Sequence, residues 1–436
     1  MTPTPQAHCD LLIIGAGPAG MAAALAAAPS GMRIVVVDDN PVPGGQIWRD
    51  GPGVQLPPLA RQHRKALARH TNIEILSSTR VVGLGDRASA GDAASLILEN
   101  AARGWTQHTN RLILCTGARE LLLPFPGWTL PGVTGAGGLQ ALIKAGLDVR
   151  GQRIAIAGTG PLLLAAASTA RKAGAQVLRV AEMTSWGALA TFAAQLVRWP
   201  AKAWQAPTLL HPGLRANAHV LEALGNTQVE GVRLQRGNTV EQLECERIAC
   251  GFGLVPNTHL GQMLGCILGE RSGLQVDALL QTTVPGIYAA GECTGFGGSE
   301  RALLQGAMAG HAAVGDSEAA QALQNQLARW NAFADALHRH FPLRTETLAA
   351  LPRPDTFVCR CEDVAHGALR QRSSWIDAKL HTRCGMGACQ GRICGAAAQV
   401  LYGWTPQPAR HLLSPARIAT LADAGSEPSQ ESIPLT

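Results

Sequence analysis

Five cysteines in the last fifth of the chain have the types and spacing best suited to chemistry. Cys359 and Cys361 form a Cys-x-Cys pair in VCRCEDV, and Cys384, Cys389 and Cys394 follow at five-residue steps in TRCGMGACQGRIC. Thiolates prefer soft or borderline metals, so the candidates are zinc and an iron–sulfur cluster. Paired cysteines of structural zinc sites are usually farther apart, so the tight pair favours two ligands on one iron of a 2Fe-2S centre. Zinc and unligated thiols stay open as alternatives.

A glycine-rich segment near the other end of the chain has the pattern of a dinucleotide site. GAGPAG follows the apolar run CDLLII directly and opens a run of small residues. Gly15 permits the tight turn, Gly17 lets a pyrophosphate approach the backbone, and Gly20 lets helix and strand pack closely. The helix N-terminus then faces the phosphates. Asp38, 23 positions after Gly15, is the acid expected to bind a ribose.

A second segment, GTGPLL, repeats this pattern less completely. It keeps Gly158 and Gly160 but has Leu163 at the third glycine position. The ribose acid is ambiguous, because Ala181 stands 23 positions after Gly158 and Glu182 one position later. No basic pair is present to bind a 2′-phosphate, which disfavours NADP. A weakly bound NAD, another adenine nucleotide such as ATP, and an empty inherited domain all stay open.

The composition limits the class of protein. The chain has 436 residues, 46% of them hydrophobic and 16% charged, which is an ordinary globular balance. The net charge of +6 comes without a basic run, so we expect no nucleic-acid partner. Clustered cysteines without a secretory signal favour metal binding in a reducing cytoplasm. The apolar stretch 11–29 contains glycines at fixed spacing and a proline, so it predicts a strand, turn and helix rather than a transmembrane segment.

Two kinds of chemistry have no support in the residues. No Cys-x-x-Cys or Cys-x4-Cys follows the Gly-Gly turn at 44–45, although thiol–disulfide catalysis at a flavin needs such a pair. Cys115, Cys250 and Cys293 stand at ends of apolar runs, which indicates buried packing. The histidines are scattered and none falls in a recognisable catalytic motif, so the catalytic residues stay unknown.

The order GAGPAG, VVVDDN, PGGQIWR, LILCTGARE and GIYAAGE is similar to the two-dinucleotide-domain flavoprotein disulfide reductase superfamily. That resemblance implies FAD in the N-terminal site, with Glu292 at a position where the superfamily usually has Asp. The implied FAD contacts are Gly15, Gly17, Pro18, Ala19, Gly20, Asp38, Asp39, Gly44, Gly45, Gln46, Arg49, Val81, Thr116, Gly117, Gly291 and Glu292. In the second nucleotide site the candidates are Gly158, Gly160 and Glu182.

The cysteine segments resemble the bacterioferritin-associated-ferredoxin-like 2Fe-2S domain. This resemblance implies that Cys359, Cys361, Cys389 and Cys394 are the ligands and that Cys384 is the spare thiol. The alternative, in which Cys384 replaces Cys394, stays open.

With LPFPGWTLPGV added, nearly the whole chain resembles the α subunit of heteromeric FAD-dependent amine dehydrogenases, which include opine oxidases, D-hydroxyproline and proline dehydrogenases, and hydrogen cyanide synthase. The resemblance implies a β subunit with a D-amino-acid-oxidase-like flavin fold that oxidises the amine, a small ferredoxin-like γ subunit, and an acceptor such as a quinone. It also allows FMN at a subunit interface. We therefore expect an electron relay. The alternatives are a self-contained NADH:acceptor oxidoreductase and a non-catalytic redox scaffold or sensor.

The expected fold class is α/β, with two Rossmann-like dinucleotide-binding domains of the disulfide-reductase-like flavoprotein fold and a small, mainly helical C-terminal iron–sulfur domain. The expected divisions are a discontinuous FAD-binding domain (1–122 and 258–325), a second nucleotide-binding domain (123–257), a helical linker (326–355), a 2Fe-2S domain (356–425) and a disordered tail (426–436). The expected location is the cytoplasm, with peripheral attachment at the inner membrane allowed.

Overall fold

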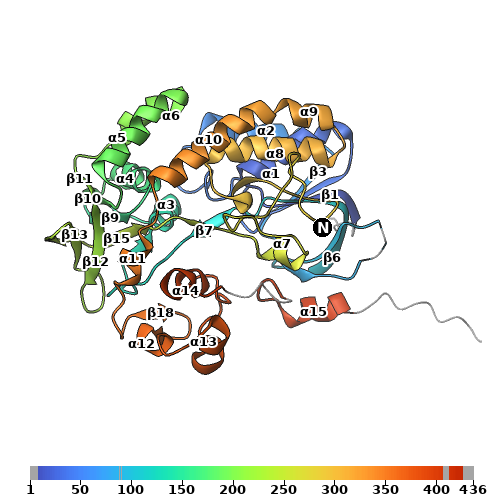
Figure 1. Ribbon diagram of the computed structural model, residues 1–436. Helices are drawn as coiled ribbons and strands as arrows, with labels where there is room; N and C mark the ends of the chain where they lie inside the picture. The colour runs from blue at the N-terminus through green and yellow to red at the C-terminus, as the bar shows by residue number, and fades with distance from the viewer. Residues whose placement is uncertain (1–7, 88, 90, 406–411, 426–436) are drawn as a thin grey trace, which may run out of the picture.

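The computed structural model describes residues 8–87, 89, 91–405 and 412–425. It has two lobes side by side, with the C-terminal region along one side of both (Figure 1). The tail predicted at 426–436 lies outside the described residues.

The first lobe is built on a seven-stranded sheet of order β3-β2-β1-β6-β5-β4, with β17 beside β6. Strands β1, β2, β3, β6 and β17 pair in parallel, and β5 pairs antiparallel with both β6 and β4. The strands are β1 (His8–Ile14), β2 (Ile34–Val37), β3 (Ile73–Leu76), β4 (Arg80–Leu84), β5 (Ala94–Glu99), β6 (Gly104–Leu114) and β17 (Ile287–Ala289). Because β17 lies far along the chain, two separate stretches build this lobe.

Helices cover this sheet. The small-residue helices α1 (Pro18–Ala27) and α8 (Ser299–Ala313) pack closely together, while α2 (Pro58–Leu67) contacts α1 and α9 (Ser317–Ala322) contacts α8. Leu260 of α7 (His259–Met263) packs with side chains of the other sheet face. Strands β1 and β2 are buried along most of their length, and their Leu, Ile and Val runs are typical of parallel strands covered on both faces.

The second lobe has a parallel sheet of order β11-β10-β9-β15-β8 and an antiparallel sheet β12-β13-β14. Its strands are β8 (Val133–Gly135), β9 (Arg153–Gly158), β10 (Gln176–Glu182), β11 (Leu214–Ala216), β12 (Ala218–Leu224), β13 (Gly231–Arg236), β14 (Thr239–Glu244) and β15 (Arg247–Gly251). Its helices are α3 (Ala136–Lys144), α4 (Leu162–Lys172), α5 (Trp186–Gln195) and α6 (Pro200–Leu209). The chain enters through β7 (Ala118–Glu120) and leaves through β16 (Leu254–Pro256), and these two strands pair with each other.

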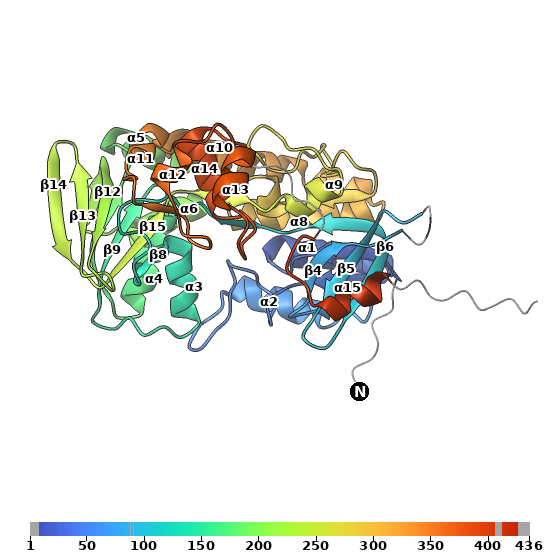
Figure 2. The same cartoon turned by 90° about the horizontal axis from the view of Figure 1, so that it is seen from below.

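The C-terminal region is mainly helical. Helix α10 (Gln324–His340) packs against α8 and α5, and so bridges the lobes. There follow α11 (Thr345–Ala349), β18 (Phe357–Cys359), β19 (Val364–Ala365), α12 (His366–Leu369), α13 (Trp375–Thr382), α14 (Cys394–Tyr402) and α15 (Ile418–Gly425). The buried side chains of β18 to α14 join the core of the second lobe. In contrast, α15 lies beside β6 of the first lobe (Figure 2).

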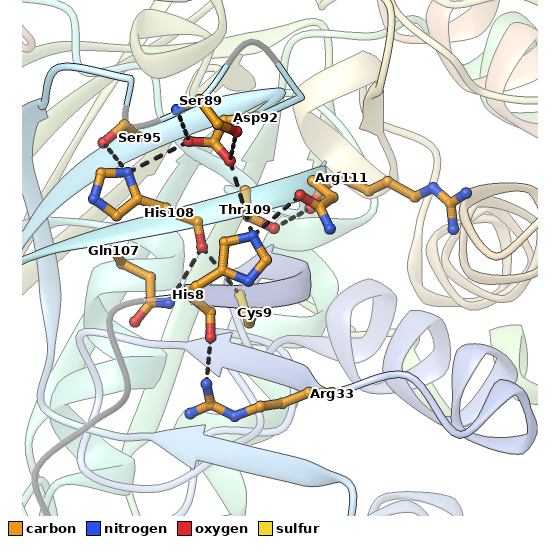
Figure 3. Close-up of polar contacts among 11 residues, drawn as sticks. His8, Cys9, Arg33, Ser89, Asp92, Ser95, Gln107, His108, Thr109 and Arg111 are labelled. Atoms are coloured by element: carbon orange, nitrogen blue, oxygen red, sulfur yellow. Dashed lines mark hydrogen bonds and ion pairs between the residues drawn. The ribbon is translucent and has the colours of Figure 1, made fainter.

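A polar group holds the start of β1 (Figure 3). The buried carboxylate of Asp92 lies 3.8 Å from His8 Nε2 and 3.7 Å from His108 Nδ1, and Ser95 Oγ lies 3.0 Å from His108 Nδ1. Arg33 donates to the carbonyl of His8. The group lies at the opposite end of β1 from the glycine turn, so it fixes the sheet rather than a cofactor. Among the described residues, no helix is both long enough and apolar enough to cross a membrane.

Candidate cofactor sites

The first glycine turn joins β1 to α1 with the close approaches that a dinucleotide cradle needs. Gly15 has φ of +105°, and a Cβ there would lie 2.3 Å from the carbonyl oxygen of Cys115. A Cβ at Gly20 would lie 1.8 Å from the carbonyl oxygen of Gly15. Helix α1 begins at Pro18 with no side chain capping it. Its N-terminus is therefore open to an anion.

The buried carboxylate of Asp38 stands beside this turn. Its Oδ2 accepts a hydrogen bond from the N–H of Ala16 at 2.5 Å, and its Oδ1 accepts one from the N–H of Asn40 at 2.7 Å. Asp38 therefore holds the turn in place and also stands where a ribose acid is expected.

A cavity of about 440 Å³ opens over the turn. Of the sixteen predicted FAD residues, the thirteen that line it are Gly15, Gly17, Pro18, Ala19, Asp38, Asp39, Gly45, Gln46, Val81, Thr116, Gly117, Gly291 and Glu292. Burial raises the pKa of Glu292, and the positive charge of Arg301 opposes that rise. The glycine cradle, the open helix end and the polar lining fit a dinucleotide.

The other three predicted residues lie behind the lining. Gly20 serves the contact between α1 and β1, and the N–H of Gly44 donates to the carbonyl of Ala16. Arg49 Nη2 donates to Gln46 Oε1 at 2.8 Å, so it orients a residue that does line the cavity.

Sequence reasoning missed several lining residues, among them Asn257 and His259. Asn257 Nδ2 donates to the carbonyl of Thr116 at 2.9 Å, which ties the return strand to the crossover. His259 follows at the start of α7, and burial together with two nearby arginines lowers its pKa to about 4. Neither residue belongs to a recognised motif. The one sequence signal available for either residue was its position at or just after the end of the apolar segment LVPN.

Cys115 also lines this cavity, and burial raises its pKa. All eleven cysteines lie in the described part of the chain, and all are free thiols.

At the second glycine turn, the structure shows which residue takes the position of the ribose acid. Strand β10 contains a bulge between Val177 and Arg179, which adds one residue and pairs Glu182 with Gly158. In the first lobe Ile14 pairs with Val37, so Asp38 stands opposite Gly15 in the same way. Glu182 is therefore the structural counterpart of Asp38, although counting along the sequence misses it by one position.

The carboxylate of Glu182 binds the backbone around it. It accepts hydrogen bonds from the N–H groups of Gly160 and Thr184, both at 2.9 Å, and burial raises its pKa. Thr184 Oγ1 donates to the carbonyl of His340 at 3.3 Å. The C-terminal end of α10 therefore lies against the acidic end of this site.

The structure brings all five C-terminal cysteines together. Cys389 lies within hydrogen-bonding reach of Cys361 and Cys394, and Cys394 reaches Cys359. The four predicted ligands thus form a continuous series of sulfur contacts. The sulfurs of Cys359, Cys384 and Cys394 lie within 4.8 Å of one another, so Cys384 joins the group from its buried side.

Protonation within this group is uneven. Hydrogen bonds from Cys384 and Cys394 lower the pKa of Cys359 to about 2, and a hydrogen bond from Cys394 lowers that of Cys389 to about 5. The hydrogen bond with Cys359 raises the pKa of Cys384 to about 12. Neighbouring thiolates repel one another, so the full set can ionise only when a cation compensates their charge. This donor set fits a thiolate-bound metal or cluster.

Two contacts set the position of the cysteine loops. A Cβ on Gly387 would lie 2.4 Å from the Cβ of Cys361, so only glycine allows this approach. Trp128, from LPFPGWTLPGV, is buried, and its Nε1 donates to the carbonyl of Phe357 at 2.6 Å. Arg360 lies over the same indole at 5.2 Å. The crossover between the lobes therefore anchors the cysteine region.

Together, the fold and the first cavity define an oxidoreductase with two dinucleotide-binding domains. Residues 9–316 match the family described as pyridine nucleotide-disulphide oxidoreductase. The A subunit of opine oxidase from Agrobacterium tumefaciens (strain Ach5) is 33% identical over 433 residues, which cover 89% of this chain and 84% of that protein. The hydrogen cyanide synthase subunit HcnB from Pseudomonas aeruginosa is 32% identical over 428 residues, which cover 88% of this chain and 90% of that protein.

Among solved structures, L-proline dehydrogenase from P. horikoshii has a TM-score of 0.66 at 19% identity, covering 95% of this chain and 79% of that chain. A T. acidophilum thioredoxin reductase has a TM-score of 0.54 at 23% identity, covering 72% of this chain and 100% of that chain. At these identities the likeness supports the fold.

The chain belongs to the pyridine nucleotide-disulphide oxidoreductase family and, within it, to the group that contains HcnB and the A subunit of opine oxidase. It is a flavin-dependent oxidoreductase, and the family supports FAD as its cofactor. The predicted family resemblance and the α/β fold with two dinucleotide-binding domains and a mainly helical, cysteine-bearing C-terminal region are confirmed. The 2Fe-2S cluster in that region stays a prediction.

Proposed function

We propose that this chain is the electron-transfer subunit of a heteromeric flavoprotein dehydrogenase that oxidises a small amino acid or secondary amine of the opine, D-hydroxyproline, proline or glycine type. The named relatives are subunits of opine oxidase and of hydrogen cyanide synthase, which supports a subunit role. Substrate oxidation then belongs to a β subunit with a D-amino-acid-oxidase-like flavin fold, and a small ferredoxin-like γ subunit completes the complex. FMN at the interface between subunits is part of the same proposal.

One observation gives the main support for the proposed electron relay. Arg392, three residues after Cys389, lines the cavity of the first glycine turn, so the two candidate redox sites share a wall. When bound, FAD supplies two-electron chemistry and a 2Fe-2S cluster carries single electrons. The thirteen lining residues would hold the FAD, and Cys359, Cys361, Cys389 and Cys394 would hold the cluster.

The cavity offers little for direct oxidation of an amine. His259 is the histidine among the described lining residues, and a pKa of about 4 makes it a weak base at neutral pH. Oxidising an amine to an imine releases two electrons and two protons, which a quinone takes up to form a quinol. The proton acceptor for the substrate is expected in the partner subunit.

The test is to purify the chain together with the products of its neighbouring genes and to mix the complex anaerobically with the four substrate types. Stopped-flow absorbance should show bleaching of the cluster in the complex with one of them, and none in the isolated chain. If that substrate reduces the flavin of the complex and the cluster stays oxidised, the relay is wrong.

A second candidate, an NADH:acceptor oxidoreductase, is favoured by the position of Glu182 opposite Gly158. It predicts rapid flavin bleaching when NADH is mixed with the isolated chain, whereas the relay predicts little. NAD and ATP can be distinguished as occupants of this site by extracting the nucleotides from the purified protein.

A further inference from the structure

Part of the wall of the FAD cavity comes from the far end of the chain. Arg392, from the loop between Cys389 and Cys394, lines the same cavity as Gly15 and Glu292. Leu413 and Ser414 line it as well. The described segment that contains them, residues 412–425, is here called the C-terminal strap.

Hydrogen bonds hold Arg392 in this position. Its guanidinium donates to the carbonyl of Leu413 and, at 3.4 Å, to that of Cys389. Its own carbonyl accepts from Arg119 Nε at 3.0 Å. Arg119 Nη1 donates in turn to Asn257 Oδ1 at 3.0 Å. The network therefore runs from the cysteine loop to the crossover beside Thr116.

The charge of Arg392 has no carboxylate partner. Within the described chain, neither Arg119 nor Arg392 forms an ion pair with a carboxylate, although both are half-buried. Arg80, another arginine of the lining, is paired with Glu99 at 2.6 Å. A partly desolvated guanidinium is costly unless an anion or hydrogen bonds compensate it. The negative charge of Cys389 acts on both arginines and raises their pKa, although burial outweighs it. An FAD diphosphate would bring a further anion into this cavity.

The strap is fastened to the first lobe. The N–H groups of Leu413 and Ser414 donate to the carbonyl of Val82 at 2.8 and 3.3 Å. The carboxylate of Glu99, buried at the end of β5, accepts from the N–H of Arg417 at 2.8 Å and from Thr420 Oγ1 at 2.7 Å. These contacts hold the strap over the Val81 side of the cavity.

We propose that Arg392 is an FAD-binding residue and that the strap closes the cavity, so that FAD and the cysteine region bind as one unit. The inference rests on the proposed occupation of the cavity by FAD. The ligand chemistry is the anionic diphosphate or the electron-rich edge of the flavin ring. In both cases the FAD binds the guanidinium of Arg392, which stands in the loop that carries the proposed cluster ligands.

The experiment uses the full chain, loaded with its cluster and stripped of FAD. Arg392→Met removes the charge and keeps most of the side-chain length. We expect the Kd for FAD, read from quenching of flavin fluorescence, to rise about tenfold or more while the visible absorbance of the cluster is kept. If the ring is the contact, the flavin midpoint potential shifts as well; if the diphosphate is the contact, only the Kd changes.

Arg370→Met is the matched control, because Arg370 is an exposed arginine of the same region that does not line the cavity. Its Kd should stay within about twofold of wild type. Arg417→Met tests the strap away from the cysteines, because it removes a guanidinium that lies 3.4 Å from Glu99 and donates to the carbonyls of Ala101 and Asn100. It should release FAD several times faster than wild type. If Arg392→Met fails to fold, the rate of FAD release from Arg417→Met still tests whether the strap closes the cavity.

Wild-type FAD affinity and potential in a folded Arg392→Met chain would overturn the proposal, as would wild-type FAD release from Arg417→Met. No substrate or partner subunit is present in these measurements, so their outcome does not depend on whether the electron relay is correct.

Discussion

The contact between Trp128 and the cysteine region yields the sharpest prediction about stability. The indole is 5% exposed, donates to the carbonyl of Phe357 at 2.6 Å, and lies under Arg360 at 5.2 Å. Phe357 is two residues before Cys359, so this bond fixes the start of the ligand loop. Trp128→Phe removes the N–H donor and keeps an aromatic ring in the core.

The expected cost follows from that geometry. Losing the bond and leaving a carbonyl without its partner costs about 1–3 kcal/mol. The smaller ring retains part of the contact with Arg360, which is worth about 0.5–1 kcal/mol at a partly exposed site. We therefore expect the C-terminal region to unfold at lower urea, with a free energy of unfolding about 2 kcal/mol below wild type. The assay follows the cluster absorbance and the near-ultraviolet circular dichroism of the holoprotein through the transition.

The control is Trp204→Phe, because the Trp204 side chain on α6 is 88% exposed. It should change the free energy of unfolding by less than about 0.5 kcal/mol. The reasoning fails if Trp128→Phe changes the free energy of unfolding as little as Trp204→Phe does. The hydrogen bond from Trp128 would then contribute nothing to holding the cysteine region on the second lobe.

Three further predictions concern the cysteines and the strap. Cys384→Ser should keep the visible absorbance of the cluster and Cys389→Ser should abolish it; the reverse result would exchange ligand and bystander. Gly387→Ala should lose the cluster, because the new methyl group would lie 2.4 Å from the Cβ of Cys361, and iron analysis measures this. Burial of Glu99 tends to raise its pKa, but hydrogen bonds from the strap and a neighbouring arginine hold it at about 2, below its ordinary 4.5. The contribution of the Glu99 carboxylate to holding the strap on the first lobe is therefore full above about pH 4.5 and is lost as pH falls toward 2. FAD release should quicken over that range, and Glu99→Gln should release FAD quickly at neutral pH and flatten the profile.

The first cofactor site was predictable from sequence because its determinants are local. Gly15, Gly17 and Gly20 lie within six residues, and Asp38 follows at the end of the next strand. Each glycine meets a backbone atom or a turn that its own neighbours create, so spacing alone carries the information.

The acid of the second site, Glu182, shows where a prediction from fixed residue spacing fails. The bulge near Val177 adds one residue to β10 without any signature in its sequence, and this moves Glu182 into the position that Asp38 holds. A bulge changes register by one residue, so a rule based on fixed spacing misplaces the side chain.

Arg392 and His259 could not be placed from sequence for a different reason. Arg392 reaches the cavity because the cysteine region packs on the second lobe while α15 lies on the first, and both contacts depend on side chains far apart in the chain. No local pattern encodes such an arrangement. The same holds for Cys384, since proximity to Cys359 and Cys394 appears only after α13 and α14 have packed.

These long-range contacts bear on how a relay would work. The two lobes are joined by the β7–β16 ribbon, which alone would leave them free to turn. The C-terminal region adds a brace, because Arg353 pairs with Glu222 of the second lobe at 2.8 Å while Arg417 and Thr420 bind Glu99 of the first. Helix α10 adds a direct connection, because it packs against α8 of the first lobe and α5 of the second. The separation between the flavin cavity and the cysteines is therefore set within this chain before any partner binds, which suits a fixed electron path better than a reductase that must turn to reach its substrate.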